Sequence, residues 1–276
     1  MIPVADTRLY AVDDPGGTPA LLFLGGGFGT VQNWSRVIRR LDGKYRTVRF
    51  DARARGKSGR SADYSVRAAV DDIGRVIDAT GIERPILVGW SHGATIAVRY
   101  AAQHPGRVGG LVLIDGAYPI AMFDEAGKQK VRTQFRRLGW IMRILAALGR
   151  SARMSPAESA DVVIEMDAVN GELGPDFAAL ACPTVFVVGT GAHSGATEDE
   201  MRTVRAAAVD AEASNSACPY SQQRPTSTHR SSTRRPTPWS PRSRTSSIGL
   251  ADRRPIGDGR SSVRTGRPMG RRERRR

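Results

Sequence analysis

The stretch 85–93 reads Pro-Ile-Leu-Val-Gly-Trp-Ser-His-Gly and stands directly before Ala-Thr-Ile-Ala-Val-Arg-Tyr-Ala-Ala at 94–102. The first four residues form a short apolar run, as expected of a buried strand, whereas 94–102 has the pattern of a helix. Ser91 therefore lies at a strand-to-helix turn, with Gly89 and Gly93 two positions away on either side. Such a turn at the end of a buried strand favours an α/β fold.

The serine at this turn is a candidate nucleophile. A tight turn of this kind holds the serine in a strained backbone conformation, and the small residues on either side leave room for it. The Ser91 hydroxyl would project above the sheet, next to the N-terminus of the following helix, whose free N–H groups can stabilise an oxyanion. The pattern Gly-X-Ser-X-Gly is a weak signal as a string and a strong one between a strand and a helix.

Apolar strands and helical patterns alternate along the rest of residues 1–213, which indicates a mostly parallel sheet with helices on both faces. The expected strands are residues 20–24, 45–50, 85–88, 110–114 and 183–188. The expected helices of the main alternation are 65–80, 94–102 and 198–213. Helical segments rich in Met, Leu and Ala interrupt the alternation at about 118–178, which predicts an inserted helical cap over an apolar substrate pocket.

The length and composition of the chain limit which classes of protein it can belong to. The 276 residues suffice for one large domain, and the chain has no apolar run of roughly 18 residues that could cross a membrane. The N-terminus lacks the pattern of a secretory signal, and neither Cys182 nor Cys218 has the spacing of a metal site. We therefore expect a cytoplasmic protein with unpaired thiols, no metal, no cofactor and no membrane partner, and the oligomeric state stays open.

The net charge of +15 is concentrated at the C-terminus. Residues 1–208 hold 26 Lys and Arg against 22 Asp and Glu, whereas residues 209–276 hold 16 Arg against 5 acidic residues. From 214 to 276 the chain is rich in Ser, Thr, Pro and Arg without apolar periodicity, which predicts a disordered tail. The arginines could bind nucleic acid or another anionic surface, but the tail carries no recognition motif, and we expect no nucleic-acid partner.

The motifs above resemble the α/β-hydrolase superfamily over residues 1–213. The resemblance implies that Ser91 is the nucleophile and that the N–H of His92 is one oxyanion donor. The loop after strand 20–24 would supply the other donor through Gly26 or Gly27. The segment 51–59, Asp-Ala-Arg-Ala-Arg-Gly-Lys-Ser-Gly, is similar to the family's D-x-R-G-x-G-x-S segment and departs from it at Ala54 and Arg55. The implied activity is a serine hydrolase of a small ester, thioester, lactone or similar acyl substrate.

A serine nucleophile needs a base and a carboxylate that orients the base. Asp115, at the end of strand 110–114, is the candidate acid, and the alternative is an aspartate that only caps the strand. The chain has four histidines, at 92, 104, 193 and 229, and none stands in the family's position on a loop between a last strand and a closing helix. A folded but catalytically impaired protein is therefore the alternative function.

A change of reading frame would explain the missing elements. In a GC-rich gene, residues 238–247 read from the third base of each codon permit Val-Val-Ala-Ala-Ile-Glu-Asp-Val-Val-Asp, an amphipathic helix. In the same frame the bases spanning Ser227 and Thr228 can spell CAC, a histidine codon. We hypothesise that a frameshift near residues 208–218 replaced the last strand, the histidine loop and the closing helix. An exposed sheet edge and poor solubility would follow.

Overall fold

The computed structural model describes residues 1–148, 152–188 and 198–214, all within one compact unit, Met1–Ser227. A second unit, Thr228–Arg276, lies outside the described residues, as does the predicted disordered tail apart from its first residue. The predicted domain boundary at 213 stays a prediction. No helix of the described residues is long and apolar enough to cross a membrane.

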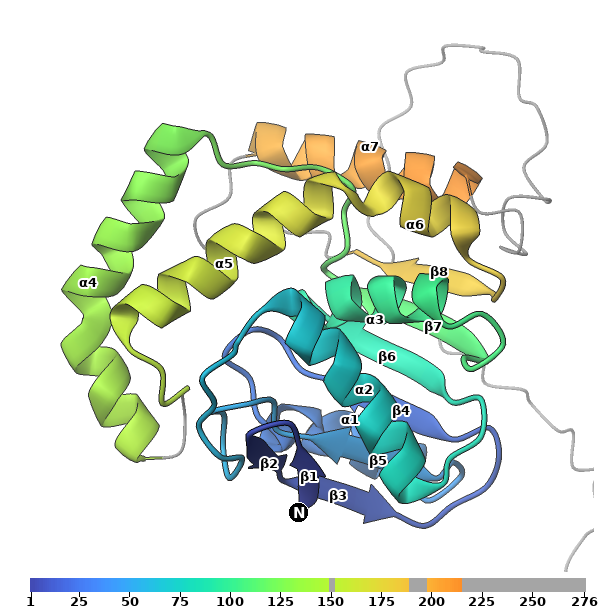
Figure 1. Cartoon of the computed structure of the whole chain (residues 1–276). Helices are drawn as coiled ribbons and strands as arrows, with labels where there is room; N and C mark the ends of the chain where they lie inside the picture. Colours follow the sequence, from blue (N-terminus) through green and yellow to red (C-terminus); the bar gives the residue numbers. More distant parts are fainter. Residues whose placement is uncertain (149–151, 189–197, 215–276) are drawn as a thin grey trace, which may run out of the picture. The chain divides into compact units, whose positions relative to one another are not determined.

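A mostly parallel sheet forms the centre of this unit (Figure 1). Its strand order is β3-β5-β4-β6-β7-β8, and only the edge strand β3 runs antiparallel to its neighbour. The strands of this sheet are β3 (Ala11–Asp14), β4 (Leu21–Leu24), β5 (Thr47–Phe50), β6 (Ile86–Trp90), β7 (Gly110–Ile114) and β8 (Thr184–Val187). A separate antiparallel pair consists of β1 (Ile2–Val4) and β2 (Thr7–Leu9). The sequence prediction of an α/β fold with a mostly parallel sheet is confirmed.

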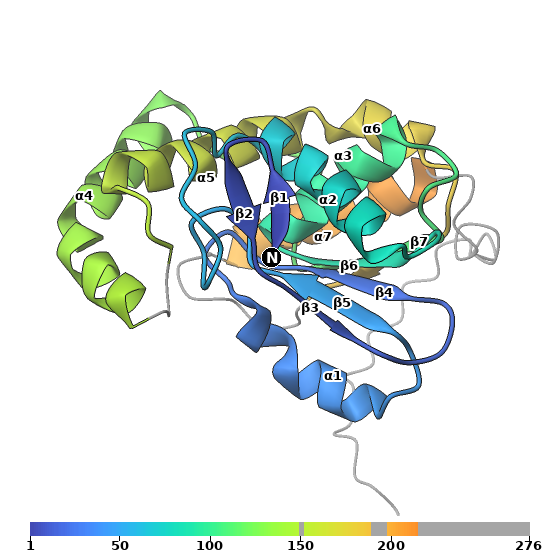
Figure 2. The same ribbon diagram turned by 60° about the horizontal axis from the view of Figure 1, so that its bottom comes forward.

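Helices cover both faces of the sheet, as the sequence predicts. Figure 2 shows α1 on the face opposite α2 and α3. The helices of the main alternation are η1 (Val31–Trp34), α1 (Ser35–Leu41), α2 (Val66–Thr80), α3 (His92–Gln103) and α7 (Glu198–Ser214). The N-cap of α2 is Ser65, whose hydroxyl accepts a hydrogen bond from the N–H of Ala68, which explains why the helix begins there.

The alternation of side chains along each strand builds two apolar layers. In β4, Leu22 and Leu24 belong to the large core beneath α2 and α3, whereas Leu21 and Phe23 face the side of α1. Phe23 packs on Trp34, with ring centroids 4.9 Å apart. The continuous apolar run of this strand is explained by its burial on both faces.

The segment of the expected cap contains α4 (Glu125–Ala147), α5 (Pro156–Gly171) and most of α6 (Leu173–Ala179). Helices α4 and α5 lie side by side (Figure 1). In α4 the only buried residue is Gly139, and Trp140 is 65% exposed. We call residues 25–29, Gly-Gly-Gly-Phe-Gly, which directly follow β4, the glycine loop. An aromatic contact joins α4 to this loop, since the rings of Phe135 and Phe28 lie 5.6 Å apart.

Candidate active site

Ser91 lies at the junction of β6 and α3, where the sequence predicts the strained turn. Its backbone has φ 53° and ψ −117°, a conformation that L-residues rarely adopt, and it is the N-cap residue of α3. The Ser91 N–H donates to the carbonyl of Ile114 at 2.9 Å, and its own carbonyl accepts from the N–H of Ala94 at 2.9 Å. These bonds to β7 and to the first turn of α3 fix the residue on two rigid elements.

The two glycines of the motif are required by close approaches of the backbone. A Cβ at Gly89 would lie 2.6 Å from the Cα of Ala94, so a side chain there would push α3 away from β6. A Cβ at Gly93 would lie 2.8 Å from the carbonyl oxygen of Gly25 and would overlap the carbonyl of Leu24. The first turn of α3 therefore packs directly on the end of β4, where the glycine loop begins.

The candidate oxyanion donors lie on two adjoining segments. His92 is the first residue of α3, so its N–H belongs to the free N-terminal donors of that helix. A Cβ built at Gly27 would lie 3.9 Å from the Cβ of His92, which places the glycine loop beside the start of α3. A Cβ at Gly26 would lie 3.0 Å from the ring of Trp90. The roles of Gly26, Gly27 and His92 as donors stay predictions.

Arg55 holds the glycine loop through a hydrogen bond to its backbone, a role that the sequence analysis did not predict. Its Nε donates to the carbonyl of Gly27 at 2.8 Å, and its Nη1 donates to the carbonyl of Arg53 at 2.7 Å. The side chain is only 4% exposed, and burial lowers the pKa of its guanidinium to about 10. The only sequence signal was a departure from the family pattern at this position.

The rest of the segment 51–59 is structural. Asp51 is buried and accepts hydrogen bonds from the N–H groups of Val31 (2.7 Å) and Lys57 (2.9 Å). Arg53 forms a bidentate ion pair with Asp72 of α2, and both N–O distances are 2.8 Å. Burial raises the pKa of the Asp72 carboxyl, although the Arg53 hydrogen bonds oppose this shift. These contacts hold the segment, and with it Arg55, in one position.

Asp115, the predicted acid, follows β7 and is exposed, with φ 43°. Its N–H donates to the carbonyl of Val187 at 3.0 Å. The next residue, Gly116, lies against Ser91, since a Cβ there would be 2.7 Å from the Ser91 Cα. Burial, and then the Asp115 charge, raise the pKa of Tyr118 to about 12. Asp115 is thus near the Ser91 turn in the chain fold, and its catalytic role stays a prediction.

Neither histidine of the described residues has the features of a base for Ser91. His92 is 6% exposed, and burial, together with the nearby Arg55 charge, lowers its pKa to about 3. Its Nδ1 is buried without a hydrogen-bond partner, and the side chain lines a hollow of about 20 Å³ with Arg55. His104 packs on Tyr100 at the opposite end of α3, about 18 Å along the helix axis. His193 and His229 lie outside the described residues.

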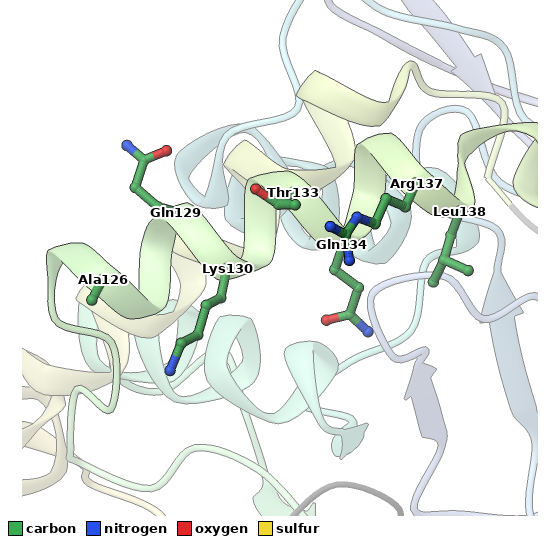
Figure 3. Close-up of a pocket in the computed structure, with 7 residues that line it drawn as sticks. All are labelled: Ala126, Gln129, Lys130, Thr133, Gln134, Arg137 and Leu138. Carbon is green, nitrogen blue, oxygen red and sulfur yellow. The ribbon is translucent and has the colours of Figure 1, made fainter.

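Helix α4 borders a hollow of about 760 Å³. Figure 3 shows that its lining side chains all come from α4, and none of them belongs to the predicted site. They are Ala126, Gln129, Lys130, Thr133, Gln134, Arg137 and Leu138. We therefore do not assign it to substrate. Among the described residues, no group of three or more His, Cys, Asp or Glu forms a potential metal site.

Comparisons with known proteins identify relatives that match part of the chain. It is 32% identical over 134 residues to a fluoroacetate dehalogenase from Burkholderia sp., covering 46% of this chain and 44% of that protein. It is 37% identical over 120 residues to a 2-hydroxymuconate semialdehyde hydrolase from Pseudomonas sp. strain CF600, covering 42% of each. The matched segment thus spans less than half the length of these relatives.

The solved structures share the fold. A structure reported in work on carboxylesterases of the ammonia-oxidizing Thaumarchaeon Nitrososphaera gargenis superposes with a TM-score of 0.60 at 17% identity, covering 77% of this chain and 84% of that chain. The family profile described as "alpha/beta hydrolase fold" matches residues 19–158, which include the glycine loop, the segment 51–59, the Ser91 turn and Asp115. On this match and on the observed sheet, the chain belongs to the α/β-hydrolase family.

Proposed function

We propose that the chain is built for serine-dependent hydrolysis of a small acyl substrate, with Ser91 as the nucleophile. The observation that carries this proposal is the backbone of Ser91, held at φ 53° and ψ −117° by hydrogen bonds to β7 and α3. Such strain is retained where a function requires it. It directs the hydroxyl away from the sheet at the N-terminus of a helix, where negative charge is stabilised.

In the proposed reaction, the Ser91 oxygen attacks the carbonyl carbon of an ester, thioester or lactone while a base takes its proton. The carbonyl oxygen gains a negative charge and accepts hydrogen bonds from the N–H groups of His92 and of Gly27 or Gly26. The leaving group departs with a proton, and water then hydrolyses the acyl-serine. Asp115 would orient the base and stabilise its cationic form.

The identity of the nucleophile favours acyl substrates over carbon–halogen or epoxide bonds. An aspartate at position 91 would suggest alkyl displacement, because the resulting ester can be hydrolysed. A serine would give a stable ether in that chemistry, whereas its acyl ester is readily cleaved by water. Although one relative is a fluoroacetate dehalogenase, Ser91 therefore supports an acyl substrate for this chain.

Activity depends on a general base that takes the proton of the Ser91 hydroxyl. His92 is buried with a pKa lowered to about 3, and His104 lies at the far end of α3. These two observations favour a second candidate, a folded protein with the hydrolase architecture and impaired catalysis. Loss of a triad histidine costs several orders of magnitude in rate. The base of an active chain would be His193 or His229.

Labelling with a fluorophosphonate probe tests the proposal. We expect the full chain to be labelled and the Ser91→Ala variant to remain unlabelled, with Ser35→Ala on α1 as the matched control. Asp115→Asn should slow labelling by roughly 10²–10⁴-fold if Asp115 orients the base. A folded wild-type chain that the probe does not label would contradict the proposal and establish the impaired alternative. His193→Ala and His229→Ala would identify the base by which of them abolishes labelling.

A further inference from the structure

Helix α4 presents an exposed row of large apolar side chains. Trp140, Ile144 and the C-cap residue Leu148 follow one another at intervals of four residues, so they lie along one side of the helix. Each of them is more than half exposed. We call these three residues the apolar row. Large apolar side chains that lie together on a surface indicate a site of interaction.

The apolar row lies on the side of α4 that faces away from α5. Helix α4 packs on α5 through Gly139, because a Cβ at Gly139 would lie 2.7 Å from the Cγ of Pro156. Ile144 and Leu148 come five and nine residues after Gly139, which places them on the opposite side of a helix. Figures 1 and 2 show no described helix or strand on that side of α4. The row is therefore not part of a core formed by the described residues.

The same helix is strongly basic. It contains six Lys and Arg and a single acidic residue, Glu125. Lys128 pairs with Glu125, and Arg132 lies 3.8 Å from Asp161 of α5. The other four basic residues have no ion-pair partner within the described part of the chain, and they are Lys130, Arg136, Arg137 and Arg143. A basic helix that also exposes Trp, Ile and Leu is typical of helices that lie in the surface of an anionic membrane.

A hollow at the C-terminal end of α4 adds further positive charge. It has a volume of about 420 Å³, and its described lining includes Arg60, Arg143 and Arg153 and no acidic residue. Arg60 also lies 3.9 Å from Glu158 of α5. Guanidinium groups bind phosphate oxygens through several N–H donors at once. The hollow therefore fits the phosphate of a lipid headgroup, next to the last turn of the helix that carries the apolar row.

We propose that α4 docks the protein on the surface of an anionic lipid bilayer, with the apolar row among the acyl chains and the unpaired arginines against the headgroup phosphates. A second copy of the chain is a poor partner for this surface, because two such basic helices would repel each other. A helix that lies in the membrane surface need not cross the bilayer, so docking requires no spanning segment. The proposal is independent of the proposed function, because the Ser91 turn takes no part in it.

Co-sedimentation of the full chain with lipid vesicles is the first test. Vesicles of phosphatidylcholine and phosphatidylglycerol are compared with vesicles of phosphatidylcholine alone. We expect binding to the anionic vesicles that weakens at high salt, because salt screens exposed charges. Absence of this binding would overturn the proposal. The 16 arginines of residues 209–276 would also attract an anionic surface, so variants of α4 must separate the two regions.

Substitutions in the apolar row test its insertion into the bilayer. We expect Trp140→Asp and Ile144→Asp each to weaken binding to anionic vesicles about tenfold or more, because a carboxylate cannot enter the acyl region. Val37→Asp on α1, at a valine that is 44% exposed, adds the same charge and should leave binding nearly unchanged. All three side chains are exposed, so the variants should fold, which circular dichroism would verify. Equal binding by the three variants would contradict the proposal.

Charge reversal tests the basic side chains of α4 with the net charge held equal. The variant Arg136→Glu with Arg137→Glu is compared with Arg39→Glu with Arg40→Glu, an exposed arginine pair on α1. We expect the α4 pair to weaken vesicle binding about tenfold or more and the α1 pair to have a much smaller effect, because a basic residue contributes mainly when it lies at the lipid surface. Equal effects of the two pairs would show that net charge alone drives binding, and would overturn the proposal.

Tryptophan fluorescence reports the contact of Trp140 with lipid directly. Trp34 is buried and Trp90 is half-buried, so a Trp239→Phe variant leaves Trp140 as the exposed tryptophan. Anionic vesicles with brominated acyl chains should quench the emission of this variant, and the further change Trp140→Phe should remove the quenching. Quenching that persists without Trp140 would contradict the proposal. The Ser91→Ala variant should bind vesicles like wild type, so a failure of the proposed function would not alter this result.

Discussion

At the scale of single residues, two buried groups under the glycine loop define the electrostatics of the site. Arg55 carries a cation that is 4% exposed and whose guanidinium bonds are to carbonyls of Gly27 and Arg53. His92 stands next to it and is held neutral, because burial and the Arg55 charge lower its pKa to about 3. A fixed positive charge beside the loop would favour an oxyanion bound by the loop.

The lowered pKa of His92 predicts a pH dependence of stability. The pKa of His92 is about 3 in the folded chain and 6.5 as the reference for the unfolded chain. Between these values the unfolded chain binds a proton that the folded chain rejects. The stabilising contribution is therefore complete above pH 6.5 and is lost as the pH falls toward 3, with a slope of up to about 1.4 kcal/mol per pH unit.

Chemical denaturation at pH 7.5 and pH 5 would measure this effect. The free energy of unfolding should drop more between the two pH values in wild type than in His92→Gln, which cannot titrate. The difference between the two proteins isolates His92 from the carboxyls of Asp51 and Asp72, whose pKa values burial raises. Equal drops in both proteins would show that His92 is protonated without penalty in the folded chain.

At the scale of elements, the packing of α3 on the end of β4 sets the geometry around Ser91. Gly93→Ala would place a methyl group 2.8 Å from the carbonyl oxygen of Gly25 and into the carbonyl of Leu24. Because those atoms are backbone, either α3 or β4 must shift. We expect a loss of about 1–3 kcal/mol in the free energy of unfolding, the usual cost of overpacking.

A matched glycine in α6 provides the control for this substitution. Nothing lies within 4 Å of a Cβ at Gly174, so Gly174→Ala should leave stability unchanged or raise it by up to about 1 kcal/mol. Both variants are compared by urea denaturation. If Gly93→Ala were as stable as Gly174→Ala, the close approach of α3 to β4 would not be a constraint of this fold.

At the scale of the whole molecule, the two faces of the sheet are unequally covered. The core beneath α2, α3 and α6 is continuous, whereas the face shared with α1 leaves Val185 and Val187 about half exposed. The sequence hypothesis of an exposed sheet edge stays a prediction. Edge strands with exposed apolar side chains pair with other chains, so the chain should self-associate.

Charged residues at this edge should reduce that association. We expect Val185→Lys with Val187→Lys to lower the light scattering of concentrated solutions relative to wild type, because lysine on an edge opposes strand pairing. Val209→Lys on α7 replaces a valine that is 40% exposed outside the sheet and should change scattering little. Equal improvement by both changes would point to net charge as the cause, and not to the β8 edge.

The strand-to-helix turn at Ser91 and the parallel sheet with its helices could be predicted from the amino-acid sequence, because they follow from local apolar periodicity and from glycines at fixed spacing. The role of Arg55 became visible in the folded chain alone, since its contact with Gly27 joins residues 28 positions apart and leaves no periodic signal. The folded chain also shows that His92 is buried and neutral and that Val185 and Val187 of β8 are about half exposed. Burial and pKa depend on every element that packs around a group, and the order of residues in one segment does not contain that information.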